Sequence, residues 1–251
     1  MLWQHVLQVP RSWLIAHDDE PIAPEHVQAY RQLEARRLAG EPMAYLLGVR
    51  EFMGHEFHVS PAVLIPRPET ELLVATAVGL LRETPAAQVL DLGTGSGAIP
   101  VSIALACPQA EVVATDLSAD ALAIARKNAQ VLGARVEFHE GSWYQALPPG
   151  KVFDLIVSNP PYIPMDDPHL TQGDLRFEPA MALCDGHDGL DAYREIVAGA
   201  PACLRPGGSL YVEHGWDQAA AVCDLLRQAG FREVRSLPDL AGILRVSGGR
   251  F

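Results

Sequence analysis

The segment of this chain with the most specific chemistry is Ser-Asn-Pro-Pro-Tyr at 158–162, which follows the apolar run Val-Phe-Asp-Leu-Ile-Val at 152–157. The run predicts a buried strand of a parallel sheet, and ligands of open α/β sheets bind at the carboxyl ends of strands. The two prolines have fixed φ angles and no backbone N–H, and Pro160 keeps Asn159 out of the helical region. We therefore predict a rigid amide corner (residues 158–162) that offers a side-chain amide, free carbonyl oxygens and the Tyr162 ring. Such a corner accepts hydrogen bonds from a planar NH2 group.

A glycine-rich loop, Asp-Leu-Gly-Thr-Gly-Ser-Gly at 91–97, follows one predicted strand and opens a predicted helix. Its glycines let the backbone turn tightly and let a ligand approach closely. Asp116 ends the next predicted strand, where its carboxylate can accept hydrogen bonds from ribose hydroxyls. With Ala98 the loop also fits a loose dinucleotide pattern, so the loop alone leaves NAD and S-adenosylmethionine open. The alternate glycines, the leading Asp91 and the amide corner favour the methyl donor.

The chain from about residue 88 onward alternates between strand-like and helix-like segments, which is typical of a doubly wound α/β domain. The predicted strands are 88–92, 111–115, 135–139, 153–157, 209–213, 231–236 and 243–246. The predicted helices are 97–106, 119–132, 191–204 and 217–229. Pro201 is expected to kink or shorten the third of these helices. We therefore expect a Rossmann-like, mostly parallel seven-stranded sheet.

The first part of the chain has a different pattern. Helices are predicted over 4–16, interrupted by Pro10, over 24–38 and over 69–81, and a short hairpin is predicted over 52–64 around Gly54. We expect a helical domain at 1–50, a hairpin linker at 51–68 and a catalytic α/β domain at 69–251.

The composition excludes several classes of protein. At 251 residues with 49% apolar side chains, the chain can form one large domain with a small appendage. Its net charge of −12 disfavours a partner that must be gripped along a phosphate backbone. No apolar stretch approaches the ~20 residues of a membrane span, and the N-terminus lacks the layout of a signal peptide. The four cysteines show no metal-ligand or disulfide spacing, so we expect reduced thiols and a cytoplasmic protein.

Together these motifs resemble those of class I methyltransferases that modify amide and amino nitrogens, and among them the release-factor glutamine methyltransferases of the PrmC/HemK type. Further segments carry the resemblance: Glu-Pro at 41–42 through Glu-Phe at 51–52, Leu-Ile-Pro-Arg-Pro-Glu-Thr-Glu at 64–71, Arg-Phe-Glu-Pro at 176–179, Asp-Gly-Leu at 188–190 and Glu-His-Gly at 213–215. The region before Glu41 is shorter than the family pattern, as if one helix of a substrate-docking domain were missing. Two explanations of the short region stay open: the start of the sequence is assigned too late, or the substrate-docking domain is trimmed. The end at 244–251 follows the family's closing strand only loosely.

The resemblance implies methyl transfer from S-adenosyl-L-methionine to the side-chain nitrogen (N5) of the glutamine in the Gly-Gly-Gln motif of class I peptide-chain release factors, with S-adenosyl-L-homocysteine as product. An amide nitrogen is a poor nucleophile because its lone pair is delocalised, so positioning must do most of the work. We predict that the Asn159 side-chain oxygen and the Pro160 carbonyl each accept one substrate N–H, which favours positive charge as it develops. Tyr162 is expected to pack on the flat amide.

The expected catalytic residues are Asn159, Pro160 and Tyr162, and the expected substrate-binding residues are these three with Pro161 and Arg67. The expected cofactor-binding residues are Gly93, Thr94, Gly95, Ser96, Gly97, Asp116, Trp143 and Asn159. Several roles stay open at this point. Trp143 lines the adenine pocket or packs in the core, and Arg67 shapes the mouth of the site or is a surface charge. Glu178 is assigned no catalytic step, and His214 is interpreted as a structural histidine.

Three other functions remain as alternatives. Glutamine methylation of a ribosomal protein fits the same motifs. Adenine N6-methylation of nucleic acid could use the same corner, but a flipped base needs a strand-binding surface that the acidic composition disfavours. A non-catalytic binding module is disfavoured by the intact Asn-Pro-Pro-Tyr. We expect a monomer whose partner is a class I release factor, without membrane or direct nucleic-acid binding.

Overall fold

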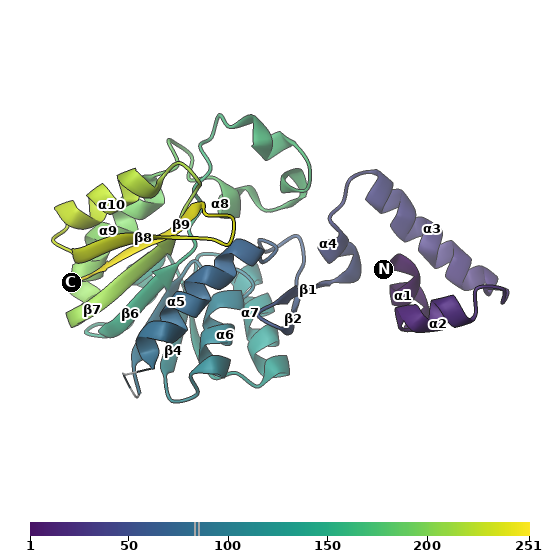
Figure 1. Ribbon diagram of the computed structural model, residues 1–251, viewed down its shortest axis with the longest axis horizontal. Coiled ribbons are helices and arrows are strands. Elements are labelled where there is room, and N and C mark those ends of the chain that lie inside the picture. The colour runs from purple at the N-terminus through teal and green to yellow at the C-terminus, as the bar shows by residue number, and fades with distance from the viewer. Residues whose placement is uncertain (83, 85) are drawn as a thin grey trace.

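The central sheet of the computed structural model, which describes residues 1–82, 84 and 86–251, has seven strands in the order β5-β4-β3-β6-β7-β9-β8 (Figure 1). The strands are β3 (Gln88–Leu92), β4 (Glu111–Asp116), β5 (Val136–Glu140), β6 (Phe153–Ser158), β7 (Leu204–Glu213), β8 (Arg232–Pro238) and β9 (Leu244–Arg250). Only β9 runs antiparallel to its neighbours among the paired strands described. The prediction of a doubly wound, mostly parallel seven-stranded sheet is confirmed.

The strand order reverses between β3 and β6. From β3 the chain builds outward to β4 and β5, and it then returns to place β6 on the other side of β3, with Leu92 paired to Ser158. At such a reversal the connections on the two sides diverge and leave a crevice at the carboxyl ends of the strands. The glycine loop follows β3 and the amide corner follows β6, so the topology brings both motifs to this crevice.

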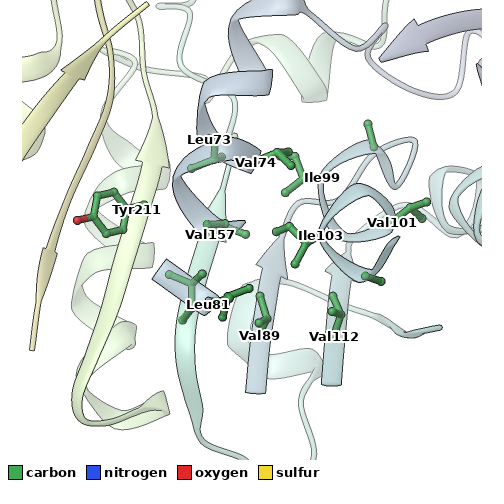
Figure 2. Packing of buried hydrophobic residues seen from close by; sticks show 14 of the residues in the cluster. Leu73, Val74, Leu81, Val89, Ile99, Val101, Ile103, Val112, Val157 and Tyr211 are labelled. Carbon is green, nitrogen blue, oxygen red and sulfur yellow. The ribbon is translucent and has the colours of Figure 1, made fainter. Parts of the chain in front are cut away.

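Helices cover both faces of the sheet. They are α5 (Glu71–Leu81), α6 (Ala98–Ala106) and α7 (Ala119–Leu132) on one face, and α9 (Asp191–Cys203) and α10 (Ala219–Gln228) on the other. Because successive strand residues point to opposite faces, Val89 packs under α5 and α6 whereas Leu90 packs under α9 and α10. Figure 2 shows Ile103 above Val89, and Leu73 beside Val74. Burying each such side chain contributes about 2 kcal/mol.

Local signals set the helix ends. Ser118 caps α7 by accepting a hydrogen bond from the Ala121 N–H at 3.2 Å, and Gly133 ends the helix at a φ of +73°. Pro201 does not break α9, because it lies in the last turn and the helix ends two residues later at Cys203. No helix in the described part of the chain combines the length and the apolar character needed to cross a bilayer.

The N-terminal part consists of α1 (Leu2–Leu7), α2 (Arg11–Ala16), α3 (Pro24–Leu38) and α4 (Met43–Leu47). In Figure 1 the first three stand apart from the sheet and join it through α4. Trp3 stacks on Tyr30 with ring centroids 4.1 Å apart, which holds α1 against α3. None of the residues of α1, α2 or α3 is fully buried. A side-chain contact with the catalytic part is made by Arg176, which donates to the Ala39 carbonyl at 2.7 Å.

Some predicted boundaries are wrong. The hairpin consists of β1 (Val49–Phe52) and β2 (His55–His58), so it starts within the predicted helical domain and ends before 59–64. Residues 59–64 form no strand. They are an irregular segment in which Val59 and Val63 are buried. Strand β7 starts at Leu204, before the predicted start at 209, and its first part pairs with an irregular register. The short elements are η1 (Pro68–Thr70), η2 (Trp143–Ala146), η3 (Pro168–Thr171), η4 (Leu175–Phe177) and α8 (Ala180–Leu183).

Candidate active site

A cavity of about 200 Å³ lies at the crevice between β3 and β6. Its walls come from the linker, the glycine loop, the loops after β4 and β5, the amide corner and α8. Nine of the expected site residues line it: Arg67, Gly93, Thr94, Gly95, Ser96, Asp116, Trp143, Asn159 and Pro161. Segments that are far apart in the sequence therefore meet around one space. Gly97, Pro160 and Tyr162 are not among the lining residues.

The glycine loop forms the floor of the cavity. Gly93 and Gly95 have φ angles of +72° and +53°, which side chains with a Cβ rarely adopt. The N–H groups of Gly93 and Thr94 both donate to the Thr115 carbonyl, at 2.9 and 3.0 Å, and tie the loop to β4. A Cβ on Gly95 would meet nothing within 4 Å, so the space beside it is open to a ligand.

Gly97 has a different role from the one predicted. A Cβ at this position would lie 3.0 Å from Ala125 Cβ and 3.1 Å from its Cα, and the φ angle is +79°. The glycine therefore lets the start of α6 pack closely on α7, and it does not face the cavity. On the same side, buried Asn128 donates to the Ser96 carbonyl at 2.8 Å and bonds the His58 backbone twice, which ties the loop to the hairpin.

Two carboxyl groups lie at the ends of β3 and β4. Asp116 accepts hydrogen bonds from the Gly95 N–H at 2.8 Å and from the Ser118 N–H at 2.9 Å. Burial raises its pKa, and these backbone donors counteract part of the rise. Each carboxylate oxygen keeps a second lone pair, so Asp116 can still accept from a hydroxyl in the cavity.

Asp91 lies behind the loop and is fully buried. Neither of its carboxyl oxygens has a hydrogen-bond partner among the described residues. Burial raises the pKa of Asp91 to about 7, and the negative charge of Asp116 adds to this effect. A carboxyl that is partly uncharged at neutral pH therefore stands directly behind the glycine loop.

The amide corner is held by hydrogen bonds to neighbouring elements. Ser158 donates its hydroxyl to the Leu92 carbonyl at 2.7 Å, which fixes the corner to the end of β3. The Asn159 amide nitrogen donates to the Thr70 hydroxyl at 3.3 Å. No donor in the described part of the chain is hydrogen-bonded to the Asn159 side-chain oxygen or to the Pro160 carbonyl. These two oxygens are the acceptors that the sequence predicted for a substrate amide.

Tyr162 does not occupy the predicted position over the cavity. Its ring packs against the core cluster that includes Tyr193, and burial raises its pKa well above the ordinary value. Its carbonyl accepts a hydrogen bond from the Gln218 amide at 2.9 Å. The same Gln218 amide donates to the Gly189 carbonyl at 3.1 Å. Tyr162 therefore anchors the corner, whereas Pro161 lines the cavity.

The linker wall depends on a buried ion pair that sequence reasoning missed. Glu178 is buried, and it pairs with Arg67 and accepts the Ile65 N–H at 2.9 Å. Tyr45 donates to the Val63 carbonyl at 2.7 Å and fixes the same segment from the other side. Arg67 and Glu178 are far apart in the sequence, so no local spacing marks them as partners. Arg67 lines the cavity and is held there by Glu178, so it is not an isolated surface charge.

Trp143 belongs both to the cavity wall and to the packing of the core. A Cβ on Gly93 would lie 3.3 Å from the Trp143 ring. Leu117 and Met181 also line the cavity and are exposed, but sequence reasoning missed them. The position of Leu117 directly after Asp116 was the available signal. His214 is buried and uses both ring nitrogens in hydrogen bonds to Gly215 and Ser247, as a structural histidine does.

Several solved structures that share this fold are named as methyltransferases. A methyltransferase from Pyrococcus furiosus matches with a TM-score of 0.61 and 20% identity, over 88% of this chain and 98% of that one. A 16S rRNA N2 G1207 methyltransferase from T. thermophilus, solved with AdoMet and guanosine, matches with a TM-score of 0.60 and 24% identity, over 80% and 49%. At these identities the likeness concerns the fold.

Sequence comparisons are more specific. The family described as methyltransferase small domain matches residues 69–172, and the PrmC N-terminal domain matches residues 1–48. A release factor glutamine methyltransferase from Bordetella pertussis is 65% identical over 99% of this chain and 92% of its own length. Proteins of the same name from Burkholderia pseudomallei and Salmonella typhimurium are 55% and 43% identical, over 100% of this chain and 90% of their lengths.

The strand order, the glycine loop after β3 and the cavity at the switch point define a class I methyltransferase. Identities of 43–65% over nearly the whole chain narrow this class further. The chain belongs to the release factor glutamine methyltransferase family.

Proposed function

We propose that this protein transfers a methyl group from S-adenosyl-L-methionine to the glutamine side-chain nitrogen (N5) in the Gly-Gly-Gln motif of a class I peptide-chain release factor. The observation that carries the proposal is one cavity that joins the glycine loop to the amide corner. The relatives at 43–65% identity support the same reaction, since all of them bear this activity in their names.

The cavity residues fit the cofactor. Gly93 and Gly95 provide a floor without side chains, and a Cβ on Gly93 would crowd the Trp143 ring. We assign the loop backbone to the methionine part, Asp116 to the ribose hydroxyls, and Trp143 with Leu117 to the flat adenine. When bound, the cofactor supplies an electrophilic methyl group on a sulfonium.

The chain's own residues would act by positioning. The Asn159 side-chain oxygen and the Pro160 carbonyl, both without other donors, each accept one N–H of the substrate amide. They stabilise positive charge on the nitrogen as it forms, and because they are fixed beforehand they cost little reorganisation. Pro161 contacts the amide from the cavity wall, which is the role first assigned to Tyr162. Arg67, held by Glu178, keeps the mouth of the cavity in shape.

The proposal extends to partners and organisation. We infer that residues 1–50 dock the release factor and that residues 69–251 catalyse the methyl transfer. Residues 51–68 link these two domains. Support comes from the exposed faces of α1, α2 and α3. We further infer a cytoplasmic monomer that does not grip nucleic acid, in keeping with a net charge of −12.

A labelling experiment tests the proposal. The protein is incubated with methyl-labelled S-adenosylmethionine and, separately, with a class I release factor, ribosomal proteins and DNA, and the label is located by mass spectrometry. We expect label on the glutamine of the Gly-Gly-Gln motif and none when that glutamine is replaced by alanine. Label only on a ribosomal protein or on adenine would overturn the proposed substrate.

A further inference from the structure

The orientation of the Asn159 amide decides whether it can bind the substrate. A substrate NH2 group is a donor, so it needs the Asn159 oxygen. A rotation of the Asn159 amide by 180° would instead present its own NH2 group and leave two donors facing each other. Something in the fold must therefore select one of the two orientations.

Two buried residues behind Asn159 can make that selection. Thr70, at the end of η1, is 4% exposed, and Glu213, at the end of β7, is 2% exposed. The Asn159 amide nitrogen donates to the Thr70 hydroxyl oxygen. The Glu213 carboxyl lies close enough to Thr70 and Asn159 for both side chains to lower its pKa as hydrogen-bond donors.

The direction of these bonds follows from the chemistry of a carboxylate, which only accepts. An ionised Glu213 therefore takes the single hydroxyl proton of Thr70, and the Thr70 oxygen is left to accept from the Asn159 NH2 group. That arrangement turns the Asn159 oxygen toward the cavity. A protonated Glu213 can donate to Thr70 instead. The Thr70 proton then faces Asn159 and favours the wrong orientation of its amide.

Glu213 acts through other side chains and not on the substrate itself. Thr70 and Asn159 line the cavity, whereas Glu213 does not, and its second oxygen has no partner in the described part of the chain. Burial raises the pKa of Glu213 to about 7, which the hydrogen bonds from Thr70 and Asn159 counteract in part.

The charged and titratable groups around Glu213 come from four elements: Glu69 on η1, Arg245 on β9, Tyr162 in the amide corner and Tyr193 on α9. Glu69 adds negative charge and Arg245 adds positive charge. Both tyrosines have raised pKa values because they are buried, so they stay neutral around pH 7. Among these groups Glu213 is the one whose charge changes near neutrality.

We propose that Glu213 is a positioning residue that, as a carboxylate, orients the Asn159 amide through Thr70, so that methyl transfer requires its deprotonation. This inference rests on the proposed methylation of glutamine. It adds two residues, Thr70 and Glu213, to the machinery of that reaction.

Three variants test the proposal in steady-state assays on a release factor. Glu213→Gln keeps the shape but can donate, and Thr70→Val keeps the shape but removes the hydroxyl. Thr70→Ser is the matched control, because it retains the hydroxyl. We expect the first two to lower kcat by about 10- to 100-fold, a fraction of the loss for deleting a whole preorganised contact. We expect Thr70→Ser, which restores the hydroxyl, to recover most of the activity that Thr70→Val loses, and the Kd for S-adenosylhomocysteine to change by less than about threefold in all variants.

The pH profile separates orientation from a merely structural role. Wild-type kcat should rise with pH through a midpoint near 7, and this rise should be absent in Glu213→Gln. The double variant Thr70→Val with Glu213→Gln should lose less activity than the product of the two single losses, since both substitutions act on the orientation of one amide. A wild-type pH profile in Glu213→Gln, or a kcat loss matched by loss of cofactor binding, would overturn the proposal.

A spectroscopic readout works without turnover. The side-chain NH2 resonance of Asn159, identified by its loss in Asn159→Ala, should shift with a midpoint near pH 7 in the wild type and not in Glu213→Gln. An unchanged wild-type resonance from pH 5 to pH 9 refutes the inference. An inactive wild-type enzyme that still shows the shift refutes the proposed substrate and leaves the orientation of Asn159 supported.

Discussion

Replacing Asp91 with asparagine should stabilise the protein, and the effect should grow with pH. Asp91 is fully buried without a hydrogen-bond partner in the described part of the chain, and its pKa is raised from 3.8 to about 7. Because the folded state holds the proton more tightly than the unfolded state, stability is undiminished below pH 3.8 and is lost as pH rises toward 7. Asparagine has the same shape and no charge to bury, so the variant lacks this loss.

The size of the effect follows from the shift. Each pKa unit corresponds to about 1.4 kcal/mol, so the raised pKa of Asp91 lowers the stability of the folded state by about 2 kcal/mol at pH 5 and by about 4 kcal/mol at pH 8, as upper values. Urea unfolding of the wild type and Asp91→Asn at both pH values measures the difference. Asp120→Asn is the matched control, because Asp120 is exposed in the first turn of α7 and should change stability by less than about 0.5 kcal/mol.

The reasoning is refuted if Asp91→Asn and the wild type lose stability in parallel between pH 5 and pH 8. A parallel loss would mean that Asp91 is already charged and solvated in the folded state. A loss confined to the variant would mean that asparagine cannot occupy the site, and the argument from burial would be equally wrong.

Three further predictions concern the cavity. Asn159→Ala should lower kcat by about 10²- to 10³-fold, measured as methyl incorporation, with cofactor affinity within a fewfold, since it removes one preorganised acceptor. Glu178→Ala should cost about 3 kcal/mol in chemical unfolding and more than Arg67→Ala, because it leaves both Arg67 and the Ile65 N–H without their partner. Gly97→Ala should destabilise the fold by about 2 kcal/mol, because the new Cβ contacts α7. Gly95→Ala should mainly weaken cofactor binding, measured by calorimetry. Equal effects of the two substitutions on the free energy of unfolding would contradict the assigned roles.

The sheet could be predicted because parallel strands are buried on both faces. Runs such as Val-Leu-Asp-Leu and Phe-Asp-Leu-Ile-Val are apolar except for one aspartate each, and their spacing with helical segments leaves few topologies. The meeting of the glycine loop, Asp116 and Asn159 followed from that topology, since each comes directly after a strand. Their common cavity needed no information beyond the strand order.

What the sequence did not reveal depends on contacts between distant segments. The Arg67–Glu178 pair, the Glu213–Thr70–Asn159 chain and the position of Tyr162 depend on how loops fold over the ends of the strands. Periodicity carries no signal for such contacts. The predicted hairpin at 52–64 extends beyond the observed end at His58. The residues that follow His58 are mostly apolar, as in a strand, but they pack as an irregular segment.

Residues 62–67 belong to the covalent connection that carries the N-terminal helices, yet they also form one wall of the cavity. A displacement of that connection would change the shape offered to the methyl donor. Occupation of the cavity would in turn restrict the positions open to the helices. If the N-terminal helices dock the release factor as proposed, this shared wall links that docking to nucleoside binding, and each should alter the affinity of the other by the same factor.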